Sequence, residues 1–231
     1  MKRLGVIGGM SWESTLVYYR LLNQGVAQRL GGLASAELVL HSVDFGEVAA
    51  AQAAGQWHEL GDALTRAAQG LRAAGAQGLV IATNTMHKLA SRVEDGSGLP
   101  LLHIADATAD AARVRGLRRI ALLGTRYTME DRSILVDRWQ SRHGLQALVP
   151  GDEDRIELHR IIYDELCRGV VSDASRQRIV AIIERLAAQG ADAVALSCTE
   201  ITLIIDDRCS PLPVLDSTAL HAAAAVDWML A

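Results

Sequence analysis

Two turns in this 231-residue sequence carry side chains that can do acid–base chemistry. Thr83 begins the turn Thr-Asn-Thr-Met-His, and Cys198 begins the turn Cys-Thr-Glu. A thiolate is a base or a nucleophile, and a position at a helix N-terminus lowers the pKa of a thiol. We predict this position for Cys198, against the alternative of a small buried core cysteine. His87, alone in its turn, is predicted to be a packed or supporting histidine rather than a base.

The two turns belong to an internal repeat. Three segments recur in the same order at offsets of 198 − 83 = 115, 124 − 8 = 116 and 216 − 106 = 110: Gly75–Thr85 with Gly190–Glu200, Leu4–Gly8 with Ile120–Gly124, and Asp106–Ala109 with Asp216–Ala219. Any two strand–helix units look somewhat alike, but three ordered matches favour a duplicated unit. The repeat makes Thr83 and Cys198 counterparts at equivalent strand ends.

Short apolar runs alternate with amphipathic segments of helical period. The predicted strands are Leu4–Gly9, Glu37–Val43, Gly78–Ala82, Leu99–Ile104, Arg119–Gly124, Leu145–Val149, Ala193–Ser197 and Pro211–Leu215. The predicted helices include Trp12–Arg29, Gly61–Ala74, Asp131–His143, Asp154–Cys167 and Ser175–Gln189. This alternation predicts an α/β fold of mostly parallel sheets flanked by helices. We expect two pseudo-symmetric lobes, residues 1–100 plus about 217–231 and residues 101–216, with the active site in the cleft between them.

Composition excludes several classes of protein. The net charge is −4 and no basic stripe is present, so neither a nucleic acid nor a membrane is an expected partner. Cys167, Cys198 and Cys209 are too few for a disulfide framework, which fits a cytoplasmic protein. Cys167 is predicted to be a core or half-buried thiol and Cys209 to lie in a polar loop. The seven histidines show no ligand spacing, so no metal is predicted.

A glycine-rich turn, Gly8-Gly9-Met10-Ser11, follows the first predicted strand. Glycines there allow a backbone to approach another group closely, and Ser11 with Glu13 indicates a helix start. The turn lacks the Gly-x-Gly-x-x-Gly pattern of a dinucleotide site, and the sequence has no P-loop. Nucleotide binding is therefore disfavoured.

The sequence resembles the cofactor-independent aspartate/glutamate racemases over essentially its whole length. The resemblance rests on Ile7–Met10, Thr83–His87 and Cys198–Glu200 in that order, with Ser42–Phe45 and Gly124-Thr125 as further landmarks. It implies a racemase that uses no pyridoxal phosphate and no other cofactor, acts on an amino acid as its small-molecule substrate, and forms a homodimer. It also implies two-base catalysis, in which one residue removes the α-proton and another returns a proton on the opposite face.

The resemblance assigns roles to individual residues. Members usually carry a cysteine in each turn, and here Thr83 replaces the first of them. Cys198 corresponds to the base for the L enantiomer, and Thr83 to a hydroxyl that can donate a proton but is a poor base. By analogy the substrate pocket is lined by Met10, Gln52, Asn84, Thr85 and Thr199, with Glu200 nearby. A preference for L substrates follows as a hypothesis.

A second departure concerns the substrate. Gln52 stands where an arginine is often found, and Val170 where a lysine is often found, so the partner of a side-chain carboxylate is missing. Arg168 and Arg176 are the candidates to replace it. We predict a racemase of acidic amino acids with L preference. The alternatives are a one-cysteine decarboxylase of the same superfamily and an amino-acid-binding protein with an inactive racemase fold.

Overall fold

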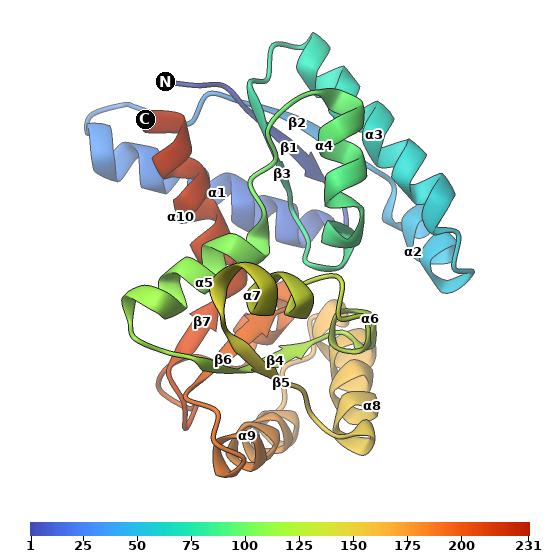
Figure 1. Ribbon diagram of the computed structural model, residues 1–231, viewed down its shortest axis with the longest axis vertical. Coiled ribbons are helices and arrows are strands. Elements are labelled where there is room, and N and C mark those ends of the chain that lie inside the picture. Colours follow the sequence, from blue (N-terminus) through green and yellow to red (C-terminus); the bar gives the residue numbers. More distant parts are fainter. The chain divides into compact units, whose positions relative to one another are not determined.

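The computed structural model describes residues 1–231 and is an α/β protein, as the sequence predicts (Figure 1). Its contacts divide the chain into two units, and each is described by itself. Unit 1 comprises Met1–His103 and His221–Ala231, and unit 2 comprises Ile104–Leu220. None of the helices combines the length and the apolar character needed to cross a membrane.

Unit 1 is built on a parallel sheet with the strand order β2-β1-β3. The strands are β1 (Leu4–Gly8), β2 (Leu38–Ser42) and β3 (Gly78–Ile81). β1 is buried throughout, as expected of a central strand in a parallel sheet covered on both faces. Beyond β3, the sheet gains a single parallel bridge between Leu79 and Leu101.

Helices cover both faces of this sheet. On one face α1 (Trp12–Leu30) and α10 (Ser217–Leu230) pack side by side, and their buried side chains share a core with Leu4, Val6 and Val80 (Figure 1). On the other face lie the remaining helices of the unit: α2 (Phe45–Ala53), α3 (Trp57–Ala73), the short 3-10 helix η1 (Thr85–Leu89) and α4 (Ala90–Ser97). The three layers hold the carboxyl ends of the strands in fixed positions.

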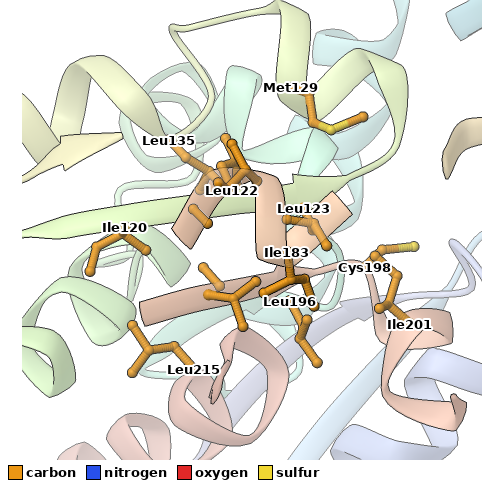
Figure 2. Close-up of a cluster of buried hydrophobic side chains, with 14 of the residues drawn as sticks. Ile120, Leu122, Leu123, Met129, Leu135, Ile183, Leu196, Cys198, Ile201 and Leu215 are labelled. Atoms are coloured by element: carbon orange, nitrogen blue, oxygen red, sulfur yellow. The ribbon is translucent and has the colours of Figure 1, made fainter. Parts of the chain in front are cut away.

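Unit 2 has a parallel sheet with the order β5-β4-β6-β7. Its strands are β4 (Arg119–Gly124), β5 (Gln146–Leu148), β6 (Ala193–Ser197) and β7 (Val214–Asp216). Its helices are α5 (Ile104–Val114), α6 (Arg126–Glu130), α7 (Val136–His143), α8 (Asp152–Arg160) and α9 (Asp173–Ala188), with the short helices η2 (Ile161–Glu165), η3 (Leu166–Arg168) and η4 (Thr199–Leu203). In Figure 1, α5 and α7 lie on one face of the sheet and α9 on the other. Figure 2 shows the aliphatic core between these layers, with Cys198 at its margin beside Ile201.

The predicted repeat appears as matching topology. In each unit the first strand is central, the second lies on one side of it, and the third lies on the other. The bridge of Leu101 to β3 corresponds to the pairing of β7 with β6. Thr83 therefore follows β3 as Cys198 follows β6.

One predicted strand is wrong and two predicted helices differ. Leu99–Ile104 forms only the single bridge at Leu101, because Pro100 has no N–H to donate and α5 begins at Ile104. The predicted helix Asp131–His143 is helical only from Val136. The predicted helix Asp154–Cys167 changes to a π-helical turn at Ile161 and to a 3-10 turn at Leu166.

The turn after β1 contains a glycine that the packing requires. Gly9 has a φ of +92°, and its N–H donates to Oγ1 of Thr15 over 2.8 Å. A Cβ at Gly9 would overlap the backbone of Val43, whose N–H donates to the Gly8 carbonyl over 3.0 Å. The ends of β1 and β2 can meet in this way only if position 9 has no side chain.

We therefore expect Gly9→Ala to destabilise the protein more than Gly55→Ala. Gly55 also has a positive φ, +70°, but a Cβ there meets nothing within 4 Å. The control should lose about 1 kcal/mol from its conformation alone, and Gly9→Ala about 1–3 kcal/mol more from overlap. Urea unfolding of both variants measures the difference, and equal losses would contradict the close approach.

Candidate functional site

The carboxyl ends of the unit 1 strands meet at one edge of their sheet, because all of the strands are parallel. Thr83 leaves β3 at this edge with its N–H bonded to the Ile81 carbonyl over 2.8 Å, and its side chain is half-buried. Met10, which follows β1, belongs to the same apolar cluster as Val48 of α2 and Met86 of η1. The structure thus gathers the turns after β1 and β3 and the helix after β2.

The other predicted substrate residues of unit 1 lie on these same elements. Gln52 is buried on α2, one turn beyond Val48, and Asn84 and Thr85 are buried at the start of η1. Asp44 caps α2 through a 2.7 Å bond from the Gly46 N–H to its carboxylate. These residues therefore lie on the turns and helices that follow the three strands of unit 1.

Three histidines gather behind Thr83, all from segments of unit 1. The rings of His87 and His103 lie 4.6 Å apart between centroids, and those of His87 and His221 lie 5.5 Å apart. Nδ1 of His87 is 2.8 Å from the Thr83 carbonyl oxygen. Because a carbonyl can only accept, Nδ1 of His87 carries a proton and anchors the turn that bears Thr83.

His221 is held at both ring nitrogens. Nε2 is 2.8 Å from the Leu102 carbonyl oxygen and therefore donates, so Nδ1 accepts from the Tyr18 hydroxyl over 2.8 Å. Burial lowers the pKa of His221 to about 4. Burial, and then the neighbouring His103 and His221, lower the pKa of His87 well below its ordinary value. Both imidazoles are thus neutral near pH 7.

In unit 2, Cys198 directly follows β6 and caps the 3-10 helix η4. Its side chain is buried, and its thiol donates to Oε2 of Glu200 over 3.0 Å. The hydroxyl of Thr199 donates to the same oxygen over 2.9 Å. The turn therefore builds a thiol–carboxylate pair from residues two positions apart.

This pair corrects our expectation for the cysteine. Cys198 lies at a helix start as predicted, but its pKa is raised well above the ordinary value rather than lowered. Burial is the main cause, followed by the negative charge of Glu200 and the hydrogen bond to it. The backbone N–H of Glu200 lowers the pKa of the thiol, but by less than these effects raise it.

Two further side chains surround this pair. Burial, with a smaller contribution from Cys198, raises the pKa of the Tyr163 hydroxyl. Cys167 is predicted to be a core or half-buried thiol, and the core position is wrong, because the residue is exposed on the 3-10 turn η3. Its thiol is still partly removed from water, and this desolvation, followed by the charge of Glu200, raises the pKa of Cys167 to about 12. The raised pKa values of Cys198, Cys167 and Tyr163 keep all three groups protonated, and therefore neutral, near pH 7.

The two arginines suggested for a substrate carboxylate already have partners in unit 2. Arg168 is largely exposed and pairs with Asp164 at 3.9 Å. Arg176 donates from Nε to the Ile204 carbonyl over 3.2 Å and pairs with Asp173. Val170 is exposed. No group of three or more His, Cys, Asp or Glu side chains is arranged to hold a metal ion.

Sequence reasoning missed four residues beside the predicted site: Tyr18, His103, His221 and Tyr163. The three in unit 1 come from α1, the segment before α5, and α10, so no local spacing links them. The sequence contains a signal only for His221, because the last helix, which carries it, is expected to belong to the first lobe. The site can therefore transfer protons, because it contains the buried Cys198 thiol and, beside it, the Glu200 carboxylate that can accept the thiol proton.

Comparisons with known proteins bear on this chemistry. The model of the Asp/Glu/hydantoin racemase family matches residues 7–225. A Yersinia pestis protein provisionally named an Asp/Glu racemase is 49% identical, with both chains covered completely and a TM-score of 0.95. PH1733 from Pyrococcus horikoshii, named an aspartate racemase homologue, is 32% identical with both chains covered completely and a TM-score of 0.85. Picrophilus torridus aspartate racemase shares the fold at 21% identity, with 99% of this chain and 94% of that chain covered and a TM-score of 0.74.

We expect Glu200→Gln to lower the pKa of the Cys198 thiol. The substitution removes the adjacent negative charge that opposes thiolate formation. The rate of alkylation by iodoacetamide against pH, in a Cys167→Ser/Cys209→Ser background, measures this shift. Glu184→Gln, on the exposed side of α9, is the control. An unchanged alkylation profile would contradict the thiol–carboxylate pair.

Stability should fall as the pH falls from about 6.5 towards 4. His221 stays neutral in the fold down to about pH 4 but is protonated near 6.5 when unfolded, so unfolding takes up a proton in this window. The slope contributed by one histidine approaches about 1.4 kcal/mol per pH unit. Urea midpoints across this window should depend less steeply on pH in His221→Asn. The exposed His58→Asn should leave the slope unchanged, and a slope equal to wild type in His221→Asn would refute this account.

Proposed function

The chain belongs to the Asp/Glu/hydantoin racemase family and is a racemase, and we propose that it racemises acidic amino acids, with L preference, by proton transfer at Cα through Cys198 and Thr83. The observation that carries the proposal is the 3.0 Å contact between the Cys198 thiol and the Glu200 carboxylate. It supplies an acceptor for the thiol proton inside the protein. The reaction would need no cofactor, since both proton carriers are side chains.

The first step forms the base. The thiol proton passes to Oε2 of Glu200, so the pair Cys–SH and carboxylate becomes thiolate and carboxylic acid. The net charge of the pair stays at −1, which matters because adding a second negative charge in a buried place would be costly. The thiolate then removes the α-proton of the L enantiomer and returns to a thiol.

The second step returns a proton on the opposite face. The Thr83 hydroxyl donates to the carbanion, and the resulting alkoxide takes a proton from water. The hydroxide left behind is neutralised through solvent by the proton that Glu200 took up, so the thiol, the carboxylate and the Thr83 hydroxyl are all restored. The bond from His87 to the Thr83 carbonyl supports this role, since it fixes the turn without placing a charged base there. The threonine hydroxyl is a weak acid, because its alkoxide is hard to form. Inversion should therefore be slower than exchange on the Cys198 face.

The L preference has a thermodynamic limit. Enantiomers have equal free energies, so kcat/KM must be equal in the two directions. A preference can then appear only as unequal kcat and KM, or as exchange with solvent that is not followed by inversion. Because Thr83 is a much poorer base than Cys198, we favour a preference that appears as exchange with solvent not followed by inversion.

The acidic substrate is the finer part of the proposal. The names of the Yersinia and Pyrococcus relatives support it. Gln52 and Val170 weaken it, as do the existing partners of Arg168 and Arg176, because a side-chain carboxylate then lacks an evident cationic partner. A cytoplasmic location, which the sparse cysteines favour, and a homodimer, which the resemblance implies, are further proposals.

The test is α-proton exchange followed by NMR in D₂O, with L- and D-aspartate, L- and D-glutamate and a panel of neutral amino acids. We expect exchange of L-aspartate or L-glutamate to outpace appearance of the D enantiomer. Cys198→Ala should abolish exchange, a loss of at least about 100-fold for a missing base, while ligand binding measured by calorimetry persists. Thr83→Cys should bring the inversion rate closer to the exchange rate.

Each alternative function has its own outcome. Faster exchange with a neutral amino acid would overturn the acidic substrate but keep the racemase. Binding without exchange of any amino acid would favour a binding protein. Release of CO₂ from a substituted malonate, without exchange of amino acids, would favour a decarboxylase.

A further inference from the structure

A side chain closes the turn after β3, whereas the turn after β6 is closed by its own backbone. In unit 2 the N–H of Ile201 donates to the Cys198 carbonyl over 3.1 Å. In unit 1 the backbone bond comes one residue later, from the His87 N–H to the Asn84 carbonyl over 3.0 Å. The Thr83 carbonyl accepts from Nδ1 of His87, over 2.8 Å. The imidazole therefore does at Thr83 what a backbone N–H does at Cys198.

The counterpart turn shows that the fold does not itself require this imidazole. Thr202 stands where His87 stands, at the offset of 115 that relates Thr83 to Cys198. Its hydroxyl donates three residues back, to the Thr199 carbonyl over 2.7 Å, and not to the residue that opens the turn. The histidine thus serves the turn of Thr83 in particular.

The direction of the His87 N–H is set by packing on two sides. The residue is 3% exposed, and its ring lies between the rings of His103 and His221. The interplanar angles are 56° to His103 and 67° to His221. In a close-packed interior the His87 ring cannot turn away from the Thr83 carbonyl without displacing one of these neighbours.

His221 is itself fixed by α1 and by the sheet. Its Nδ1 accepts from the Tyr18 hydroxyl and its Nε2 donates to the Leu102 carbonyl, both over 2.8 Å. The N–H of Leu102 in turn donates to the Leu79 carbonyl of β3 over 2.9 Å. Tyr18 and His221 are fully buried, so water cannot replace their bond unless the core opens. Tyr18, His221 and His87 therefore connect α1 and α10 to the turn that follows β3.

We propose that His87 is a positioning residue for proton donation by Thr83, and that Tyr18 and His221 act on the reaction through it. This role rests on the proposed function, in which the Thr83 hydroxyl returns the proton. Such a weak acid must be held close to the carbanion, since a misplacement of about 1 Å can cost about 100-fold in rate. The Thr83 side chain is half-buried, and its place follows from the peptide that His87 holds.

The role is confined to one half of the reaction. His87 holds Thr83 within unit 1, while Cys198 and Glu200 form their own pair within a turn of unit 2. Loss of the bond from His87 should therefore slow inversion without slowing exchange of the α-proton of the L enantiomer. A variant that only weakened the fold would slow both rates.

The test measures both rates together by NMR in D₂O, on whichever of L-aspartate, L-glutamate or the neutral amino acids the wild-type protein exchanges fastest. In His87→Leu, which removes the donor, the ratio of inversion to exchange should fall about tenfold or more. His87→Asn should restore most of the ratio, because asparagine can donate to the carbonyl four residues before it, as Asn23 does to Tyr19 over 2.8 Å. Thr108→Val is the matched control and should leave the ratio unchanged. It removes another buried bond from a side chain to the carbonyl four residues before it, that of Ile104, over 3.0 Å.

A double-mutant cycle tests whether Tyr18 acts through His87. Tyr18→Phe removes the hydroxyl that donates to His221 and keeps the ring in place, so it should lower the ratio by a smaller factor than His87→Leu. Added to His87→Leu, the same substitution should have no further effect, because the bond to Thr83 is already lost. Independent, additive effects would contradict action through His87.

The outcomes separate this role from the proposed function. No exchange of any amino acid by the wild-type protein would overturn the proposed function and the positioning role together. Exchange with an unchanged ratio in His87→Leu, or with equal losses in both rates, would reject the positioning role alone. If His87→Leu does not fold, Tyr18→Phe decides, and an unchanged ratio in that variant would reject the role.

Discussion

The hydrogen bond from the Cys198 thiol to the Glu200 carboxylate is the interaction on which the chemistry of the turn after β6 depends. It places one proton and one negative charge between two atoms in a buried setting. The end of a buried parallel strand is suited to this arrangement, because β6 fixes Cys198 while the 3-10 turn bends Glu200 back towards it. A longer α-helix would direct more N–H groups at the sulfur and favour a permanent thiolate. The short turn keeps a thiol, and leaves the carboxylate to share its proton.

Unit 1 has the same strand-and-turn backbone as unit 2, but with different side chains in the turn. β3 and its turn repeat β6 and its turn, yet no carboxylate stands two residues beyond Thr83, where Thr85 is buried at the start of η1. Behind that turn lie neutral imidazoles, whose protonation burial opposes. The duplicated backbone therefore positions two polar side chains equivalently, while the proton-carrying capacity of the two turns is unequal.

The sequence was informative where structure is local. Buried strands and the turns that follow them are set by short apolar runs, so β1, β3, β4 and β6 were predicted almost to the residue. Leu99–Ile104 is equally apolar, but Pro100 restricts it to one bridge. The position of Cys198 at a helix start predicts a lowered pKa, whereas burial, which depends on the tertiary fold, and then the charge of Glu200 raise it. The cluster of His87, His103 and His221 could not be read from spacing, because η1, the segment before α5 and α10 are far apart in the sequence and only the tertiary fold brings them together.

The turn of Cys198 can both take and give a proton more readily than the turn of Thr83, and this difference limits the reactions that such a fold can catalyse. A symmetric pair of bases must each be able to take and give a proton, whereas a pair with one hydroxyl needs only one good base. The equal free energies of enantiomers constrain the overall equilibrium but not the rate of exchange on each face. In the proposed mechanism, a hydroxyl at position 83 therefore leaves proton removal by Cys198 intact and slows inversion. Because Glu200 and Cys198 belong to the same turn, the proposed proton removal depends on local geometry within unit 2 and not on the side chain at position 83.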